Sequence, residues 1–401
     1  MTGRIQKEPG HSHSEIRPHR GVLETTLEPL TENASAERSA ALSPNGAGTA
    51  EGTKRRTLTP SFSESGGRSG HLPTIDALRG IAALSVCWFH YTNAQFTEQF
   101  GAYQASGRYG WLGVQIFFVI SGFIIPFSLF RAGYRVKGFF RFMLKRIARL
   151  DPPYLTSIVI VVSGLWLFSL QPGHPPYQIP WDQVLAHLGY INAFLGMPWL
   201  QMPYWSLAIE FQYYIFVGLC FPILAMRKRM APAVIIALFA ALTTVASGNR
   251  ALLPHYLPLF VVGILAFRYK SLNVRAWDTL LGLVAAQVLV VWVDGWMEAV
   301  VSMGACAAIL LVTLENPVLK FFGNISYSLY LIHVFVGNIV FGLALRWTRR
   351  PELLKWVLPF VAAAIAIGAA YLLYRLVELP SRRLAARISY KAAETPPVQP
   401  A

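Results

Sequence analysis

The chain is dominated by long apolar runs that begin near residue 75 and recur to about residue 377. A run of about 20 apolar residues can cross the hydrocarbon core of a bilayer. Hydrophobic residues make up 54% of the 401 residues and charged residues only 14%, which is too apolar for an ordinary soluble protein. We therefore predict an all-α fold, that of a polytopic integral membrane protein with about ten transmembrane helices. The expected spans are 75–93, 110–130, 153–171, 205–226, 231–247, 254–268, 277–294, 298–315, 322–345 and 353–377.

The basic residues, which give a formal net charge of +15, stand in short clusters between the apolar runs. In a membrane protein such clusters set the orientation, so they do not indicate a nucleic-acid partner. Most clusters fall on one side if the spans alternate, whereas the loop 172–204 on the other side has no Lys or Arg. This bias predicts that both termini are cytoplasmic, against the single contrary cluster at 346–355. The clusters assigned to the cytoplasmic side are 131–149, 227–229, 268–275 and 382–387.

The two ends of the chain differ from its apolar centre. Residues 1–70 are rich in Ser, Gly, Ala and Pro, with almost no aromatic residues and no sustained periodicity. Such a segment cannot bury enough apolar surface to offset the entropy of ordering it. We predict a disordered cytoplasmic N-terminal extension over 1–70, a transmembrane domain over 71–388 and a short C-terminal tail over 389–401.

Several kinds of site are missing from the sequence. Cys87, Cys220 and Cys306 are far apart inside apolar runs, so we interpret them as packed thiols. No His, Cys and Asp cluster has zinc spacing, and no Gly-rich loop precedes a Lys-Ser or Lys-Thr pair. The Gly-x-Ser-x-Gly turn of serine acyl-enzymes is absent as well. We therefore predict neither a metal site nor a bound cofactor.

The first expected span carries two ionisable residues, Arg79 and His90. They are eleven residues apart, which in a helix separates them by about 16 Å along the axis and returns them to nearly the same face. One interpretation is an arginine that extends to the membrane surface and a histidine bonded to a neighbouring helix. The other is a functional pair that faces one cavity from two depths, because ionisable groups within a membrane are costly. The spacing alone leaves both open.

Six sequence blocks together carry a resemblance to a known family. The first block, "DALRGIAALSVCWFH", contains the Arg and the His with ten residues between them. In this order the blocks resemble the acyltransferase-3 family, the bacterial membrane O-acyltransferases of polysaccharides, lipids and some natural products. The resemblance covers about residues 73–387. The other blocks are "GVQIFFVISGFII", "RFMLKRIARLDPPYL", "YWSLAIEFQYY", "FGNISYSLYLIH" and "LVELPSRRL".

The resemblance implies a phosphate-bearing acyl donor, acyl-CoA and in particular acetyl-CoA, held by Arg79, Arg146 and Arg149. Arg146 and Arg149 are at i, i+3 and share a helical face at the expected cytoplasmic boundary. Without the resemblance, an anchor for lipid phosphates explains them better. Gly113, Ser121 and Gly122 of the second block are interpreted as small residues for close helix packing.

Two further blocks supply polar residues to the expected membrane interior. Glu210 lies four residues after Ser206, near the outer end of its span, and is either a substrate-binding or histidine-supporting group or a structural carboxylate. His333 lies near mid-membrane, where its face either bonds neighbouring helices or, as the resemblance implies, lines the reaction chamber. The candidate acceptor-binding or cavity-lining residues are Ser206, Tyr213, Ser326 and Tyr330.

These expectations combine into one reaction in the bacterial inner (plasma) membrane. His90 acts as general base while an acyl group moves from acyl-CoA to a hydroxyl of a sugar or lipid-linked envelope glycan. Glu210 and His333 complete the predicted catalytic set. An acyl intermediate on His90 stays open. Two further alternatives stay open. In one, the acceptor is a secreted natural-product sugar, such as that of a macrolide. In the other, the chain is a non-catalytic glycan or lipid transporter.

Overall fold

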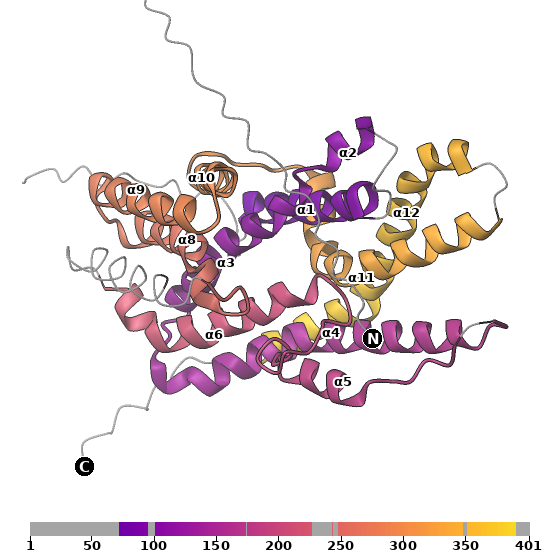
Figure 1. The fold of residues 1–401 in the computed structure, drawn as a ribbon. Helices are drawn as coiled ribbons and strands as arrows, with labels where there is room; N and C mark the ends of the chain where they lie inside the picture. Colours follow the sequence, from indigo (N-terminus) through magenta and orange to yellow (C-terminus); the bar gives the residue numbers. More distant parts are fainter. Residues whose placement is uncertain are drawn as a thin grey trace, which may run out of the picture. The chain divides into compact units, whose positions relative to one another are not determined.

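The computed structural model describes residues 72–94, 101–173, 175–226, 243, 248–347 and 351–389. Within these ranges all regular secondary structure is helical (Figure 1). The predicted disordered extension and nearly all of the predicted C-terminal tail lie outside them. The α-helices are α1 Pro73–Phe89, α2 Gly101–Gly107, α3 Gly113–Arg131, α4 Phe139–Ser169, α5 Trp181–Leu188, α6 Tyr204–Leu224, α8 Leu253–Leu272, α9 Ala276–Val293, α10 Trp296–Leu311, α11 Pro317–Trp347, α12 Pro351–Leu373 and α13 Leu379–Ala386.

The expected membrane spans coincide with helices wherever the structure describes them. The span predicted at 231–247 lies outside the described residues except for Thr243. Six helical segments are long and apolar enough to cross a bilayer, and the count of ten stays a prediction. These segments are Gln104–Arg131, Val136–Ser169, Tyr204–Leu224, Ala276–Val293, Pro317–Ala344 and Trp356–Ala386.

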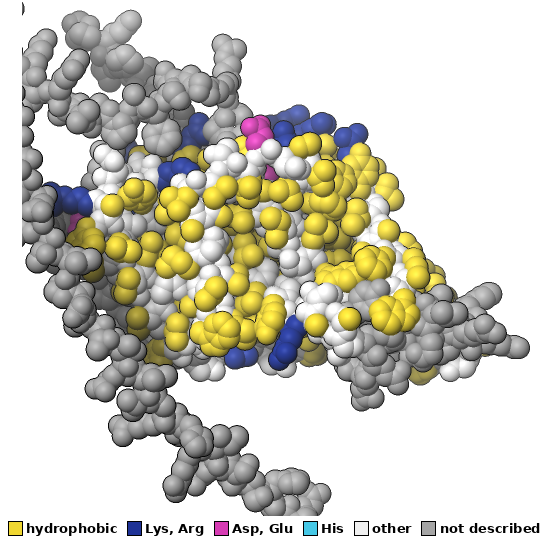
Figure 2. Space-filling view, turned by 90° about the horizontal axis from the view of Figure 1, so that it is seen from above, with side chains coloured by type: hydrophobic (Ala, Val, Ile, Leu, Met, Phe, Trp, Pro, Cys, Tyr) yellow, Lys and Arg dark blue, Asp and Glu magenta, His cyan; other side chains and the backbone are white. Residues whose placement is uncertain are grey.

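Apolar side chains cover much of the outer surface of these helices. Val288 and Trp292 of α9 are 63% and 58% exposed, and Leu372 of α12 is 59% exposed. Figure 2 shows apolar side chains across one face, with Lys and Arg mainly along its margins. Contiguous exposed apolar surface is rare on soluble proteins and normal for helices in contact with lipid. The chain is a membrane protein.

Helices α3 and α8 approach each other closely through two glycines. A Cβ atom on Gly122 would lie 2.2 Å from the carbonyl oxygen of Phe260, and one on Gly263 would lie 2.1 Å from that of Val119. A larger residue at either position would push the two backbones apart. Gly113 is in similar contact with the carbonyl of Ala82 in α1. The predicted packing role of the second sequence block is thereby confirmed.

Helix α4 differs from the predicted span. The span was expected to start at 153, yet the helix begins at Phe139 and continues through Pro152 and Pro153. The boundary prediction was wrong because the helix tolerates both prolines, although proline removes a backbone donor. Tyr327 of α11 donates to the carbonyl of Leu150 just before the prolines, at 2.8 Å. The basic block is therefore part of one long helix with the apolar half.

The segment after α4 folds back onto it. Tyr190 donates a hydrogen bond to Asp151 at 3.0 Å, and its ring stacks on Tyr154, with centroids 5.0 Å apart. His187 of α5 is fully buried and accepts the N–H of Leu200 at its Nε2 atom. This contact leaves the hydrogen on Nδ1, which faces the carbonyl of Gln183 at 2.7 Å. The expected outer loop is thus an ordered wall beside α4 and α6.

A buried arginine closes the end of α6. Arg268 of α8 is 1% exposed, and its two terminal nitrogens donate to the carbonyls of Leu224 and Met226. The last carbonyls of a helix have no partner within the helix. Arg268 satisfies that of Leu224 with a charge-assisted bond, also bonds the carbonyl of Met226 two residues beyond the helix, and is favoured there by the negative end of the helix dipole.

Candidate functional site

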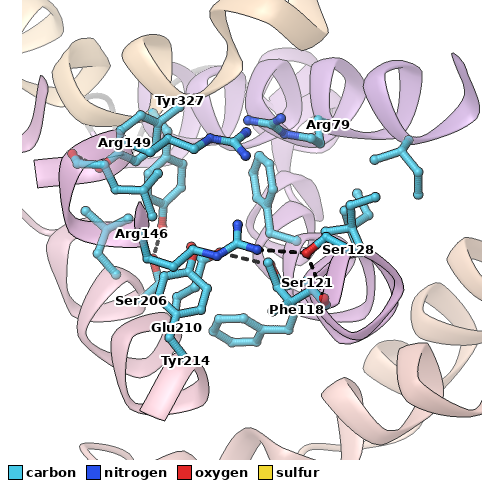
Figure 3. Close-up of a pocket in the computed structure, with 18 of the residues that line it drawn as sticks. Arg79, Phe118, Ser121, Ser128, Arg146, Arg149, Ser206, Glu210, Tyr214 and Tyr327 are labelled. Atoms are coloured by element: carbon cyan, nitrogen blue, oxygen red, sulfur yellow. Dashed lines mark hydrogen bonds between the residues drawn. The ribbon is translucent and has the colours of Figure 1, made fainter. Parts of the chain in front are cut away.

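A cavity with a volume of about 290 Å³ lies among α1, α3, α4, α6 and α11. We call it the arginine cavity, because three arginines from two helices line it (Figure 3). Its remaining lining is mixed, with aromatic and aliphatic side chains around a few hydroxyls and one carboxylate. The polar lining residues are Arg79, Ser121, Ser128, Lys145, Arg146, Arg149, Ser206, Glu210, Tyr214, Tyr327 and Tyr330.

Arg79 and Arg149 point toward each other across this cavity (Figure 3). Arg79 comes from α1 and Arg149 from α4. Neither guanidinium has a side-chain hydrogen bond or ion pair among the described residues. Two like charges that face each other repel, and the arrangement is favourable only when an anion lies between them. Planar guanidiniums bind phosphate oxygens in pairs, so the geometry suits a phosphate-bearing ligand.

Arg146 is held more firmly than the other two arginines. Its Nη2 atom donates to the hydroxyl of Ser128 at 3.0 Å. The guanidinium carbon lies 5.2 Å from the ring centroid of Phe142 and 5.5 Å from that of Tyr214. Such cation–π contacts fix the plane of the group. Its Nε atom is buried and has no hydrogen-bond partner among the described residues, so Nη2 carries the one side-chain hydrogen bond described for this group.

Glu210 supplies the cavity's carboxylate. One of its oxygens accepts hydrogen bonds from Ser121 at 3.0 Å and from Tyr214 at 2.5 Å. Glu210 was expected near the outer end of its span and Arg146 at the cytoplasmic boundary, yet both line one cavity. They meet because α4 extends back to Phe139 and packs beside α6. The predicted separation in depth was therefore wrong.

Ser206 and Tyr330 form one part of the cavity wall. Their hydroxyl oxygens are 2.6 Å apart, and the Ser206 hydroxyl also donates to the carbonyl of Pro203 at 3.0 Å. Because Ser206 uses its hydrogen on that carbonyl, Tyr330 donates to Ser206. The Tyr330 ring makes an edge contact with Phe117, whose side chain also lines the cavity. Both predicted residues thus belong to the site.

His90 and His333 lie next to the cavity and not in its lining. Their ring centroids are 5.1 Å apart. The ring of Tyr330, which does line the cavity, lies 5.9 Å from that of His333. The sequence predicted that Arg79 and His90 face one shared cavity, but only Arg79 lines it. Tyr330 and His333 therefore stand between the arginines and His90.

Two other predicted residues point elsewhere. Tyr213 is fully buried and stacks on Phe260, with centroids 4.1 Å apart. Ser326 is also fully buried, and its hydroxyl donates to the carbonyl of Gly323 in its own helix. Neither side chain lines the arginine cavity. In the described part of the chain no group of three or more His, Cys, Asp or Glu is placed to hold a metal ion.

Several lining residues were not singled out from the sequence. Ser121 was grouped with the small packing residues, although it donates to Glu210. Nothing in the sequence was a reason to single out Ser128, since a serine in an apolar helix is common. Tyr327 occupies a conspicuous aromatic position, but its bond to α4 depends on how two distant helices cross. Only the tertiary structure identifies these three.

A helical membrane protein with unpaired guanidiniums around one cavity is suited to bind an anionic ligand at the membrane. Comparison with known proteins gives the class a name. Residues 72–375 match the family described as "Acyltransferase domain" (Acyl_transf_3), which is most of the chain. This chain belongs to the acyltransferase-3 family of membrane acyltransferases, as its six sequence blocks predicted.

Individual relatives agree with the family assignment. Acyltransferase MdmB of Streptomyces mycarofaciens is 28% identical over 79% of this chain and 93% of its own length. Putative O-acetyltransferase SACOL0978 of Staphylococcus aureus (strain COL) is 25% identical over 78% of this chain, which spans 58% of that protein. Putative acetyltransferase ORF330 of Acidianus two-tailed virus is 26% identical over 70% of this chain and 92% of its length. No solved structure matches the chain.

Proposed function

We propose that this acyltransferase moves an acyl group, acetyl in the simplest case, from acyl-CoA to a hydroxyl of a sugar or lipid-linked envelope glycan. The observation that carries the proposal is the pair Arg79 and Arg149, two guanidiniums that face one cavity and have no side-chain partner within the described ranges. The phosphates of coenzyme A offer the anionic oxygens that such a pair binds bidentately. Acyl-CoA enters as a substrate, and the proposal includes no bound metal or cofactor.

The cavity suits part of such a donor. Its volume of about 290 Å³ is at the lower end for small-molecule sites, so it takes the phosphate-bearing part and a section of the pantetheine arm. Apolar residues such as Phe117, Ile120 and Leu207 would pack along the arm. We assign Arg146 a share of the phosphate contacts, because its guanidinium lines the cavity beside Arg149.

His90 is proposed as the general base on the far side of Tyr330. It takes the proton of the acceptor hydroxyl as the oxygen attacks the thioester carbon. The carbon–sulfur bond then breaks, and the thiolate leaves and takes up a proton to form free coenzyme A. Tyr330 can donate to the developing oxyanion if its hydroxyl turns away from Ser206. Glu210 supports this arrangement through the fixed positions of Ser121 and Tyr214.

The proposed location is a bacterial inner membrane with both chain termini in the cytoplasm. The support is the distribution of basic clusters along the sequence. In this orientation the donor arrives from the cytoplasm, where acyl-CoA is made. A lipid-linked acceptor would arrive from within the membrane or from its outer side.

The test is thioester turnover by the full-length chain in lipid nanodiscs. With acetyl-CoA and a supplied glycan or lipid-linked acceptor, we expect free coenzyme A and an acetylated acceptor, both detected by mass spectrometry. His90→Ala should abolish acceptor acetylation while the protein stays folded. Near-normal transfer by this variant would refute the base assignment. Acceptor movement across the bilayer without thioester cleavage would indicate a transporter and overturn the proposal.

A further inference from the structure

His90, which is half-buried, and His333 form a pair, and the tautomer of His333 follows from its hydrogen bonds. His333 is fully buried, and its Nδ1 atom lies 3.0 Å from the carbonyl oxygens of Leu329 and Tyr330. Carbonyl oxygens only accept, so Nδ1 carries the hydrogen. In a neutral imidazole the other nitrogen is then an acceptor. Nε2 of His333 is that acceptor, and it has no partner among the described residues.

The ring of His90 is the imidazole next to this unpartnered acceptor. The two centroids are 5.1 Å apart, with an angle of 52° between the ring planes. Two imidazoles at that separation are within reach of an N–H···N hydrogen bond of about 2.9 Å when a nitrogen of each ring faces the other. A buried acceptor without a donor is costly, which favours that contact.

The backbone around His90 is tied to the same helix. His90 begins a π-helical turn, His90–Ala94, a type of turn that is frequent at functional sites. The next residue, Tyr91, is 1% exposed and donates to the carbonyl of His333 at 2.6 Å. Its ring packs against Gly337, where a Cβ atom would lie 2.5 Å from it. This anchor places His90 opposite His333.

We propose that His333 is a positioning residue that accepts an N–H from His90 and so fixes the tautomer of the catalytic base. The other nitrogen of His90 then keeps its lone pair for the proton of the acceptor hydroxyl. A base is effective when a second group holds it in one tautomer, as the carboxylate of a serine-protease triad does. Here a neutral imidazole does so, and its own tautomer is set by two backbone carbonyls. The inference rests on the proposed role of His90.

The kinetic test compares His333→Gln with His333→Phe in the full-length chain. Gln keeps an acceptor oxygen near the position of Nε2, whereas Phe removes it. We expect Phe to lower kcat by about 100-fold with the donor KM unchanged, and Gln to recover about tenfold of that loss. Equal kcat values for the two variants at equal thermal stability would overturn the proposal.

The anchor has a matched control. Tyr91→Phe removes only the hydroxyl that reaches His333, and Tyr134→Phe removes a buried hydroxyl that donates to the carbonyl of Gly218 at 2.8 Å, far from the pair. We expect both variants to lose similar stability, but only Tyr91→Phe to lower kcat, by about tenfold. Equal kcat for the two would contradict the role of Tyr91.

A readout independent of activity separates this inference from the proposed function. Solid-state NMR of the protein with ¹⁵N-labelled histidine should show a coupling across an N–H···N bond that disappears in His333→Gln. Absence of that coupling in the wild-type chain overturns the pair whatever the activity. If the coupling is present and His90→Ala stays active, the base assignment fails and the hydrogen-bonded pair stands.

Discussion

The protein uses arginine in two different ways at two places. Arg268 gives both terminal nitrogens to the end of α6, and Arg382 pairs with Glu378, which also accepts from Ser328. Arg79 and Arg149, in contrast, face each other across a cavity and have no side-chain partner among the described residues. All carry the same guanidinium, and only the surroundings differ.

This difference distinguishes arginines that stabilise the fold of a membrane protein from arginines that bind a ligand. A guanidinium whose terminal nitrogens are hydrogen-bonded to the protein contributes to folding, and its removal leaves the acceptors of those bonds unpaired. A charge without a partner costs folding free energy, so its presence implies a ligand that supplies the partner. Mutation of a paired arginine should therefore lower stability and leave ligand binding unchanged. Mutation of an unpaired arginine should weaken ligand binding and leave stability unchanged or higher.

The double substitution Arg79→Ala with Arg149→Ala should give the largest effect. Two sets of charge-assisted hydrogen bonds to the donor are lost, so its affinity should fall by about 100-fold or more. Thermal stability should stay equal or rise, because a like-charge repulsion is removed. Isothermal titration with acetyl-CoA and a thermal unfolding scan measure the two quantities.

The exposed residue Arg135 on the same basic segment provides the control. Arg135→Ala removes a positive charge without touching the cavity, so donor affinity should change less than twofold. A loss as large as that of the double variant would mean that general charge attraction, and not the facing pair, binds the donor.

Arg268→Met should show the opposite pattern. Loss of two charge-assisted bonds to the carbonyls of Leu224 and Met226 should lower the free energy of unfolding by about 2 kcal/mol. The donor affinity of the folded fraction should be unchanged, as titration of the purified protein would measure. If Arg268→Met is as stable as the wild-type chain and binds the donor poorly, the structural role assigned to Arg268 is wrong.

Arg146 lies between these two cases, because it is hydrogen-bonded to Ser128 and also lines the cavity. Arg146→Lys keeps the charge but loses the planar fork that bonds Ser128 and packs against Phe142 and Tyr214. We expect about a tenfold loss of donor affinity together with about 1 kcal/mol of stability. If stability falls and donor affinity does not change, Arg146 has a structural role like that of Arg268.

The smallest expected effect concerns His187 in α5, outside the membrane-spanning segments. Burial lowers the pKa of His187, and the bond to the carbonyl of Gln183 offsets this in part. Because the folded protein holds the neutral form, the contribution to stability is complete above the ordinary pKa of about 6.5 and declines as pH falls below it. His187→Gln should flatten that decline in a thermal unfolding series from pH 7.5 to 5. An unchanged slope would assign the decline to other groups.

The sequence located much of the site without showing its arrangement. The family resemblance predicted Arg79, Arg146 and Arg149 as donor-binding residues, and all three line the cavity. Helical spacing predicted His90 on the same face as Arg79. Spacing within one helix does not show how far along that face the cavity extends. The wall made by Tyr330 and Ser206 depends on the contact of α11 with α6, residues 124 positions apart.

The sequence by itself determined that this chain is a helical membrane protein of the acyltransferase-3 family, because apolar length and motif order are local properties. The continuity of α4 through two prolines, the meeting of Glu210 with Arg146 and the separation of His90 from the arginine cavity were decided only by the tertiary structure. Helix crossings and the filling of space between them involve residues far apart in the chain. No local pattern encodes those contacts.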